Sequence, residues 1–283
     1  MPSDIIAQFM QDGFLVLEDL FTENEVNELK SAGDKLTQEI PTDCRKCVFS
    51  TTQTQQSKDK YFLESADKIS YFYEAGALNE GGELQVDPSV SLNKVGHALH
   101  WLHPTFRKVT FCERVKEVCY QLGMEDPVVV QSMYIYKNPG IGSEVVPHQD
   151  STFVHTEPNT TVGFWIALED ATLENGCLWF VRGSHCSGVH RRFIRNPDNT
   201  SADLLIYDKP PQIYPNSAFR SEPVKKGTCI VIHGQVVHKS EHNKSQKSRH
   251  AYTFHVIDAK NSKYSQENWL QTEEGFKSVY QNY

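Results

Sequence analysis

The first third of the chain alternates helical and extended patterns of hydrophobic residues. Residues 3 to 13 have the apolar spacing of a short helix that ends at Gly13. The run Phe14–Leu17 is apolar throughout and predicts a strand. Thr22 and Glu25 have the spacing of a capping box, which predicts the start of a second helix. The apolar face of that helix is expected to consist of Val26, Leu29 and Leu36.

Two further segments precede residue 125. Residues 43–87 are polar and mixed, with a turn expected at Gly81-Gly82. Residues 88–123 carry apolar residues at helical spacing, interrupted at Pro104. Early in that segment the recurring residues are Leu92, Val95, Ala98 and Leu99. Residues 1–125 are therefore expected to be mainly helical.

From Pro127 onward the pattern changes to short β-branched and aromatic runs separated by turn residues. Asn175-Gly176 lies between two apolar runs and predicts a β-hairpin, because both positions tolerate positive φ. The segment 193–222 is rich in Asn, Asp and Pro and is too long for a tight turn, so we expect a lid or substrate loop. The apolar runs themselves are 128–136, 163–168, 229–233 and 251–256. This pattern is typical of a β-sandwich or jelly roll with its core at about 127–260.

Composition limits the number of domains and the kinds of partner. A chain of 283 residues with 39% hydrophobic residues can form one domain over 1–283. The 28 Lys and Arg residues are outnumbered by 36 Asp and Glu, for a net charge of -8. This charge repels phosphate backbones, so no nucleic-acid partner is expected. Arg191, Arg192 and Arg195 form a local basic cluster that we interpret as solvated surface.

The sequence also predicts where the protein resides. No apolar stretch approaches the roughly 20 residues that span a bilayer, and the residues after Met1 lack the pattern of a signal peptide. The last residues do not form a peroxisomal signal. We therefore expect a cytoplasmic protein with no membrane association, with its seven cysteines as reduced thiols and no obligate protein partner.

His148-Gln149-Asp150 is the first candidate for chemistry. In an extended segment, residues two apart project from the same face, so the imidazole and the carboxylate would converge. Iron(II) in oxygenases is commonly held by two histidines and one carboxylate, which leave adjacent metal positions open. By itself the short motif is weak evidence, because a surface histidine beside an aspartate is common.

A third ligand must come from a distant part of the chain, and His233 and His238 are both available. They are five residues apart, so an unbroken strand would point them to opposite faces, and local physics does not choose between them. Arg249 favours His238, because a hairpin through the polar segment 241–248 would bring the guanidinium beside it on the adjacent strand. A guanidinium suits the distal carboxylate of a keto diacid.

The sequence resembles the phytanoyl-CoA dioxygenase family over essentially its whole length. The resemblance rests on Phe9-x-x-Asp12-Gly13-Phe14, Asn93–His100, Val129–Ile135, Pro147–Asp150, Glu169–Phe180, Gly183–His185, His233–Lys239 and Asn268–Leu270. It implies a mainly β protein with flanking helices, whose core is a double-stranded β-helix of the jelly-roll, cupin-like type. It also implies iron ligation by His148, Asp150 and His238, with Arg249 on 2-oxoglutarate. Further residues of the cosubstrate pocket, by the same resemblance, are Lys94, Met133, Gln149, Trp165 and Ser240.

The activity that this resemblance implies is an iron(II)- and 2-oxoglutarate-dependent dioxygenase. Such an enzyme decarboxylates 2-oxoglutarate to succinate and CO₂ while O₂ hydroxylates a prime substrate, with ascorbate as a supporting reductant. The substrate is expected to be a small molecule, with an acyl-CoA or another metabolite as alternatives. Two other functions stay open: a non-catalytic sensor that binds metal and 2-oxoglutarate in the same fold, and a zinc hydrolase. The hydrolase would need a general base near the open metal position, and no residue in the sequence stands out as one.

Overall fold

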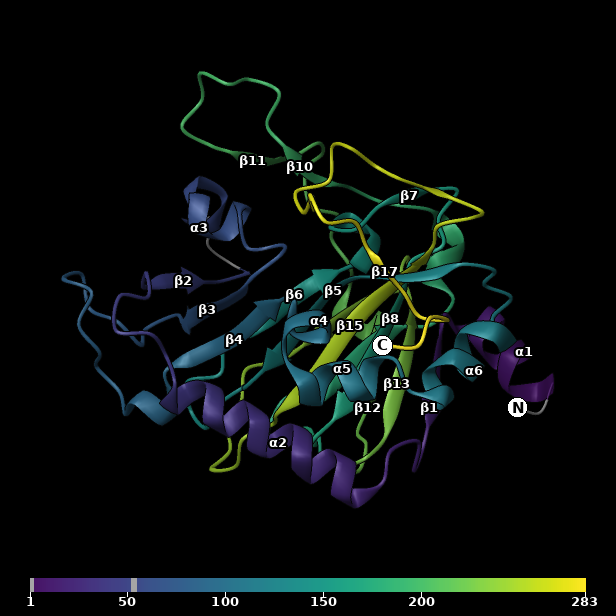
Figure 1. The fold of residues 1–283 in the computed structure, drawn as a ribbon, viewed down its shortest axis with the longest axis horizontal. Coiled ribbons are helices and arrows are strands. Elements are labelled where there is room, and N and C mark those ends of the chain that lie inside the picture. The colour runs from purple at the N-terminus through teal and green to yellow at the C-terminus, as the bar shows by residue number, and fades with distance from the viewer. Residues whose placement is uncertain (1–2, 52–54) are drawn as a thin grey trace.

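The computed structural model describes residues 3–51 and 55–283, which form two facing β-sheets with helices on one side (Figure 1). The major sheet has the strand order β1 (Phe14–Leu17), β13 (Cys229–His233), β8 (Val162–Ala167), β15 (Ala251–Asp258), β5 (Pro127–Ile135), β4 (Leu92–His97), β3 (Ile69–Glu74) and β2 (Cys47–Phe49), and β17 (Lys277–Ser278) also pairs with β5. The minor sheet has the order β12 (Arg220–Glu222), β9 (Leu178–Val181), β14 (Val237–Ser240) and β6 (Val145–His148). Together the sheets form a double-stranded β-helix, and only β2 and β3 pair in parallel among these strands.

Short elements surround this core. The helices are α1 (Ser3–Asp12), α2 (Glu23–Gln38), α3 (Lys60–Leu63), α4 (Leu99–Leu102), α5 (Pro104–Thr110) and α6 (Glu113–Gln121). Two small antiparallel pairs are β10 (Phe193–Arg195) with β11 (Leu205–Tyr207), and β7 (Thr156–Glu157) with β16 (Lys263–Tyr264). The 3-10 turns are η1 (Gln55–Lys58), η2 (Pro88–Val90), η3 (Asp150–Thr152), η4 (Ser184–Ser187) and η5 (Asn216–Ala218). In the described part of the chain, every helix is too short or too polar to cross a bilayer.

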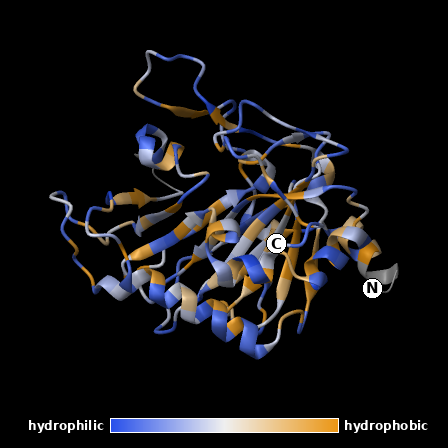
Figure 2. Cartoon of the chain, in the orientation of Figure 1, coloured by the Kyte–Doolittle hydropathy of each residue, from blue (hydrophilic) through white to orange (hydrophobic). Residues whose placement is uncertain are grey.

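The two faces of the major sheet have different neighbours. Its outer face packs under α2, α5 and α6 in one apolar cluster, to which β15 contributes Tyr252 and Phe254. Its inner face points toward the minor sheet, and here β15 contributes Thr253 and His255. Successive side chains of a strand project to opposite sides, so each central strand contributes to both environments. Figure 2 shows hydrophobic residues concentrated on the strands and hydrophilic residues on the exposed side of α2.

The predictions for the first forty residues are confirmed. The first helix ends at Asp12, and Gly13 follows with a φ of 83°, a conformation that glycine adopts without strain. The strand at Phe14–Leu17 pairs with β13. The capping box is present at Thr22, which accepts a hydrogen bond from the backbone N–H of Glu25.

The helical prediction for residues 88–123 is wrong over its first part. Residues 92–97 form β4, which lies between β3 and β5, whereas the helices α4, α5 and α6 follow only from Leu99. Both faces of β4 are covered, so its buried residues do not alternate with exposed ones. Its apolar positions therefore resemble a helical repeat, and strand pairing decides the structure.

The predicted hairpin at Asn175-Gly176 is also wrong. Gly176 does take a turn conformation, with φ 91°. However, the strands on either side belong to different sheets, because β8 lies in the major sheet and β9 in the minor sheet. The turn therefore carries the chain across from one sheet to the other. The segment 193–222 contains the β10–β11 hairpin and the edge strand β12, and its side chains Phe193 and Tyr207 line the central cavity.

Candidate active site

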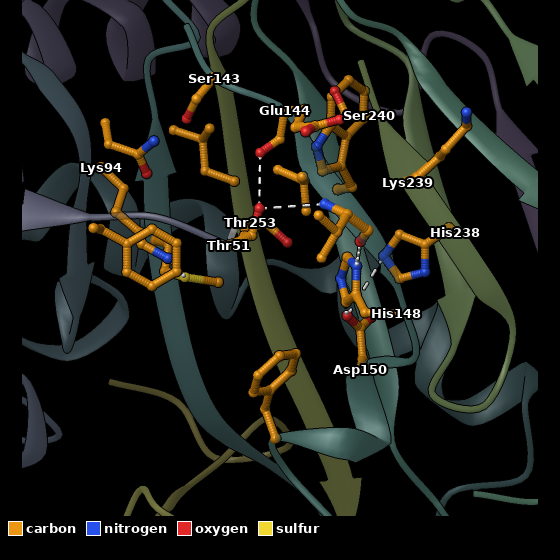
Figure 3. Close-up of a pocket in the computed structure, with 18 of the residues that line it drawn as sticks. Thr51, Lys94, Ser143, Glu144, His148, Asp150, His238, Lys239, Ser240 and Thr253 are labelled. Carbon is orange, nitrogen blue, oxygen red and sulfur yellow. Dashed lines mark hydrogen bonds and ion pairs between the residues drawn. The ribbon is translucent and has the colours of Figure 1, made fainter. Parts of the chain in front are cut away.

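His148, Asp150 and His238 converge between the two sheets (Figure 3). His148 is the last residue of β6 and pairs directly with His238 on β14, while Asp150 begins the 3-10 turn η3. Their candidate ligand atoms all lie within 4.8 Å of one another. The Nε2 atoms of both histidines are 3.6 Å from Oδ1 of Asp150. Among the described residues this is the one group of histidine, cysteine and acidic side chains with metal-binding geometry.

Backbone carbonyls orient both histidine rings. Nδ1 of His148 lies 2.9 Å from the carbonyl oxygen of Val146, and Nδ1 of His238 lies 3.1 Å from that of Val236. Since a carbonyl only accepts, each Nδ1 carries a proton, and each Nε2 faces Asp150 as the atom that a metal could bind. Burial lowers the pKa of His238 to about 4, which keeps this imidazole neutral at physiological pH. Both rings thus have the tautomer that a metal requires.

A third histidine holds the carboxylate. His255 on β15 places Nε2 at 3.2 Å from Oδ2 of Asp150, and its Nδ1 lies 3.1 Å from the amide nitrogen of Gln131. Burial tends to raise the pKa of Asp150, but the contact with His255 outweighs it and holds that pKa well below its usual range. Gly163 leaves the necessary room, because a Cβ there would lie 2.9 Å from Oδ2 of Asp150.

His233, the alternative third ligand, lies away from this group. It ends β13 in the major sheet, and its ring packs at 4.9 Å from that of His185. The chain crosses between the sheets after Gly234, so the two histidines do not share one strand. The structure therefore brings together His148, Asp150 and His238 and leaves His233 out.

Arg249 reaches the same cavity from the other sheet. It lies two residues before β15, whereas β14 has β6 and β9 as neighbours, so the predicted hairpin between Arg249 and His238 is wrong. Its side chain nevertheless reaches Ser240: Nη2 donates to Oγ at 3.3 Å, and Nε donates to the carbonyl of Gly176 at 3.1 Å. The guanidinium also packs on the ring of Trp165, at 5.1 Å from its centroid.

The remaining nitrogen of Arg249 points to an anionic ligand. Nη1 is buried without a hydrogen-bond partner in the described structure, and the residue is only 1% exposed. Burial lowers the pKa of Arg249 to about 10, so the group stays charged at neutral pH. An unpaired buried cation is costly, and a carboxylate that accepted from Nη1 would remove this cost.

The other predicted pocket residues divide into two groups. Lys94, Met133, Trp165 and Ser240 line a cavity of about 180 Å³ together with the three candidate ligands and Arg249. Nζ of Lys94 has no carboxylate partner within the described residues and instead approaches Sδ of Met133 at 4.0 Å and the ring of Phe49 at 3.1 Å. Figure 3 shows Lys94 across the cavity from His148, Asp150 and His238.

Gln149 is not brought into the cavity. It lies between two residues that point inward, so its own side chain points to the opposite side. There its amide group donates to the carbonyls of Gly188 and Gln235, at 2.8 and 2.7 Å, and accepts from the backbone N–H of His190 at 2.8 Å. Gln149 thus connects the ligand-bearing turn to the segment around His190.

The donor set fits iron and 2-oxoglutarate. Two imidazoles that present Nε2 and one carboxylate, all on the same side of the metal position, are the ligands of iron(II) oxygenases with open metal positions. Arg249 and Lys94 are basic groups in the same cavity without carboxylate partners in the described part of the chain. They suit a small dianion bound beside the metal.

Sequence reasoning missed four residues that shape this site. His255 and Gln131 orient Asp150, Gly163 makes room for it, and the carbonyl of Gly176 accepts from Arg249. A glycine inside an apolar strand signals close approach of another group, and Gly163 carries that signal. His255 shares one face of a predicted strand with Thr253, but nothing local marks it as a neighbour of Asp150.

Comparisons with known proteins agree with this geometry. A profile of the family described as Phytanoyl-CoA dioxygenase (PhyH) matches residues 9–251. The chain is 45% identical to a phytanoyl-CoA dioxygenase domain-containing protein 1 homolog from Caenorhabditis elegans, over 97% of each chain. It is 46% identical to phytanoyl-CoA dioxygenase domain-containing protein 1 from Bos taurus, over 94% of this chain and 93% of the relative.

A solved structure shares the fold at much lower identity. The epimerase SnoN, in complex with Fe3+, alpha ketoglutarate and nogalamycin RO, is similar with a TM-score of 0.63 and 16% identity. The match covers 98% of this chain and 97% of that one. At this identity the likeness shows a common architecture, and the residues described above carry the chemistry.

Proposed function

This chain belongs to the phytanoyl-CoA dioxygenase family of 2-oxoglutarate-dependent non-haem iron oxygenases, and on that premise we propose that it hydroxylates a small-molecule substrate. The observation that carries the proposal is the convergence of His148, Asp150 and His238 in one cavity with the unpaired guanidinium of Arg249. The three candidate metal ligands alone would be compatible with other metal sites, and Arg249 alone would be compatible with other anion sites.

We assign the binding roles as follows. His148, Asp150 and His238 would hold iron(II) through two Nε2 atoms and a carboxylate oxygen. Arg249 would bind one carboxylate of 2-oxoglutarate through Nη1, while Ser240 and the Gly176 carbonyl fix the guanidinium. Lys94 would supply a second cation, and Trp165 and Met133 apolar walls. Bound together, iron(II) and 2-oxoglutarate supply oxidative decarboxylation to succinate and CO₂, coupled to hydroxylation.

The protein's own contribution is orientation and charge. The carbonyls of Val146 and Val236 fix the protons of both histidines at Nδ1, so neither ring must change tautomer when metal binds. His255 holds Asp150 ionised and at a fixed angle. The buried position of Arg249 excludes water from the anion, which strengthens the contact.

The test measures binding and turnover separately. Wild type, His148→Ala and Arg249→Lys are titrated with nickel(II) and then with 2-oxoglutarate by calorimetry, and succinate formation is measured with iron(II), ascorbate and air. We expect His148→Ala to lose nickel binding and Arg249→Lys to lose 2-oxoglutarate affinity while it still binds nickel. His233→Ala is the matched control, since its ring lies outside the site, and it should keep both.

Three outcomes would count against the proposal. Failure of the wild type to bind 2-oxoglutarate in the presence of metal would contradict the cosubstrate assignment. Binding without succinate formation, with or without added substrates, would favour a non-catalytic sensor. Retention of nickel affinity in His148→Ala, with circular dichroism unchanged, would remove this histidine from the ligand set.

A further inference from the structure

Three arginines near one end of the cavity have different surroundings. Arg192 donates to Glu267 at 2.8 Å, and Arg195 donates to the carbonyl of Trp269 at 3.2 Å. Arg191 lines the cavity, and its guanidinium has no carboxylate partner in the described structure. The basic cluster is therefore not a uniform solvated surface, and one of its members is available to an anion inside the cavity.

The backbone holds Arg191 in place. On one side, the N–H of His190 donates to Oε1 of Gln149 at 2.8 Å. On the other, the N–H of Arg192 donates to Oδ1 of Asp208 at 2.7 Å. Gln149 lies between the candidate ligands His148 and Asp150, so the segment that carries Arg191 is tied directly to the metal-binding turn.

A continuous aromatic wall leads from the metal site to Arg191. The ring of His148 lies 5.9 Å from that of Phe153, and Phe153 lies 5.8 Å from Phe193. Phe193 pairs across the β10–β11 hairpin with Tyr207 at 4.8 Å, and Cζ of Arg191 stacks 3.9 Å above the Tyr207 ring. All five side chains line the cavity. The wall suits an apolar body, and the guanidinium at its end suits an acid.

Trp269 provides an independent observation. It lines the same cavity, is 2% exposed, and its indole N–H has no hydrogen-bond partner within the described residues. Its ring is held by stacking on Phe62 at a centroid distance of 4.4 Å. A buried donor of this kind is normally satisfied, so a ligand acceptor that reached it would remove the cost of its burial.

We propose that Arg191, Trp269 and the aromatic wall of Phe153, Phe193 and Tyr207 form the prime-substrate subsite, and that it takes an organic acid with a free carboxylate on an apolar body. The carboxylate binds at Arg191, and the apolar body lies along the wall toward His148. This inference rests on the proposed function, because it assigns the substrate class of the same site.

The surroundings of Arg191 favour a free carboxylate over a coenzyme A thioester. A coenzyme A ester carries several phosphate charges and would need several free cations where it binds. Here Arg192 is paired with Glu267, and Arg195 is bonded to a backbone carbonyl. The cavity of about 180 Å³ must also hold the cosubstrate. One unpaired guanidinium matches one carboxylate.

The test compares the binding of matched ligands to protein loaded with nickel(II) and 2-oxoglutarate. Nickel(II) takes the place of iron(II), so binding is measured without turnover. Phenylacetate, phenylpropionate and phenylbutyrate are titrated by calorimetry, each beside the corresponding alcohol and coenzyme A thioester. We expect at least one acid to bind about tenfold or more tightly than its alcohol, as a charge-assisted contact implies. Arg191→Gln should remove that preference and leave the alcohol affinity within about twofold of the wild-type value. Arg191→Lys, which keeps the positive charge, should retain part of the preference.

Arg107 is the control, because it also stacks on an aromatic ring, Trp101 at 5.7 Å, but lies outside the cavity. Arg107→Gln should keep the acid preference. If no acid binds more tightly than its alcohol, or if the thioesters bind most tightly, the inference is overturned. The nickel and 2-oxoglutarate affinities from the same samples report on the proposed function, so failure of that function is seen separately.

Discussion

The two faces of the major sheet are formed by the same strands, but one packs against helices and the other lines the cavity. On the outer face, Phe106 of α5 packs against Tyr252 at a ring distance of 4.8 Å, and Oη of Tyr252 is bonded to Thr110 at 2.7 Å. On the inner face, one residue further along β15, Thr253 and His255 line the cavity. The polar groups named on the outer face are satisfied within the protein.

The cavity beside the inner face instead contains unsatisfied polar atoms. Nη1 of Arg249, Oε1 of Gln131 and the indole nitrogen of Trp269 are all buried without partners in the described part of the chain, and all three residues line the cavity. Unsatisfied buried groups reduce stability, and a ligand that completed those in the cavity would remove this cost. The comparison indicates that substitutions on the outer face should change stability, whereas those on the inner face should change binding and activity.

The largest expected effect is that of Asp150→Ala on the inner face. It removes the single carboxylate of the candidate metal site, so nickel affinity and succinate formation should fall below detection. The free energy of unfolding should also fall, because the lowered pKa of Asp150 means that the folded site stabilises this carboxylate and because His255 loses its partner, but the variant should remain folded. Calorimetry and denaturant titration measure the two quantities, and coupled turnover retained by the variant would refute the metal assignment.

The next effect concerns His255, which orients Asp150. We expect His255→Gln to weaken metal binding by roughly 10- to 100-fold, as for other groups that hold a metal ligand. The measurement is competition for nickel(II) with a chelator. His185→Gln is the control, because His185 is also buried and its Nε2 lies 3.1 Å from the Met10 carbonyl oxygen, outside the site. Equal losses in both variants would show a general effect of removing a buried histidine.

Gly33→Ala tests the outer face. A Cβ at Gly33 would lie 2.0 Å from Cζ of Tyr134, so α2 would have to move away from the sheet. We expect a loss of about 1–3 kcal/mol in the free energy of unfolding, as for other overpacked cores, with 2-oxoglutarate affinity unchanged. Ser31→Ala, at an exposed position of α2, controls for helix propensity. A large change in 2-oxoglutarate affinity would contradict the expectation that substitutions on the outer face change stability and leave binding unaffected.

The smallest effect is a pH dependence from Lys94. Burial lowers its pKa from 10.5 to about 7 in the protein without ligands. Between these values the unfolded chain binds more protons, so stability of this state should rise with pH across that window. The charged amine favours an anion, so 2-oxoglutarate affinity should instead fall, by about fivefold between pH 7 and pH 8.

Two observations would check the role of Lys94. Binding of 2-oxoglutarate above pH 7 should take up a proton, which calorimetry detects as a heat that depends on the ionisation enthalpy of the buffer. Lys94→Met should abolish both the proton uptake and the fall in affinity. If the variant keeps the pH dependence of the wild type, another group is responsible.

The sequence by itself determined the local elements and the chemistry of the motifs. The capping box at Thr22, the strand at Phe14–Leu17 and the extended run that became β5 depend on neighbours within a few residues. The spacing of His148 and Asp150 likewise predicted that two candidate ligands lie on one side of the chain. The long motif matches to a known family indicated the fold and the third candidate ligand.

Only the tertiary structure decided which distant residues meet. It made β4 a strand, separated His233 from His238 by moving the chain between sheets, and placed Arg249 beside Ser240 without a hairpin. It also separated Arg191, which lines the cavity, from Arg192 and Arg195, which are bonded to Glu267 and to the Trp269 carbonyl. The physical reason is that periodicity reports which face a residue occupies, whereas the partner across that face is set by how the two sheets close on each other.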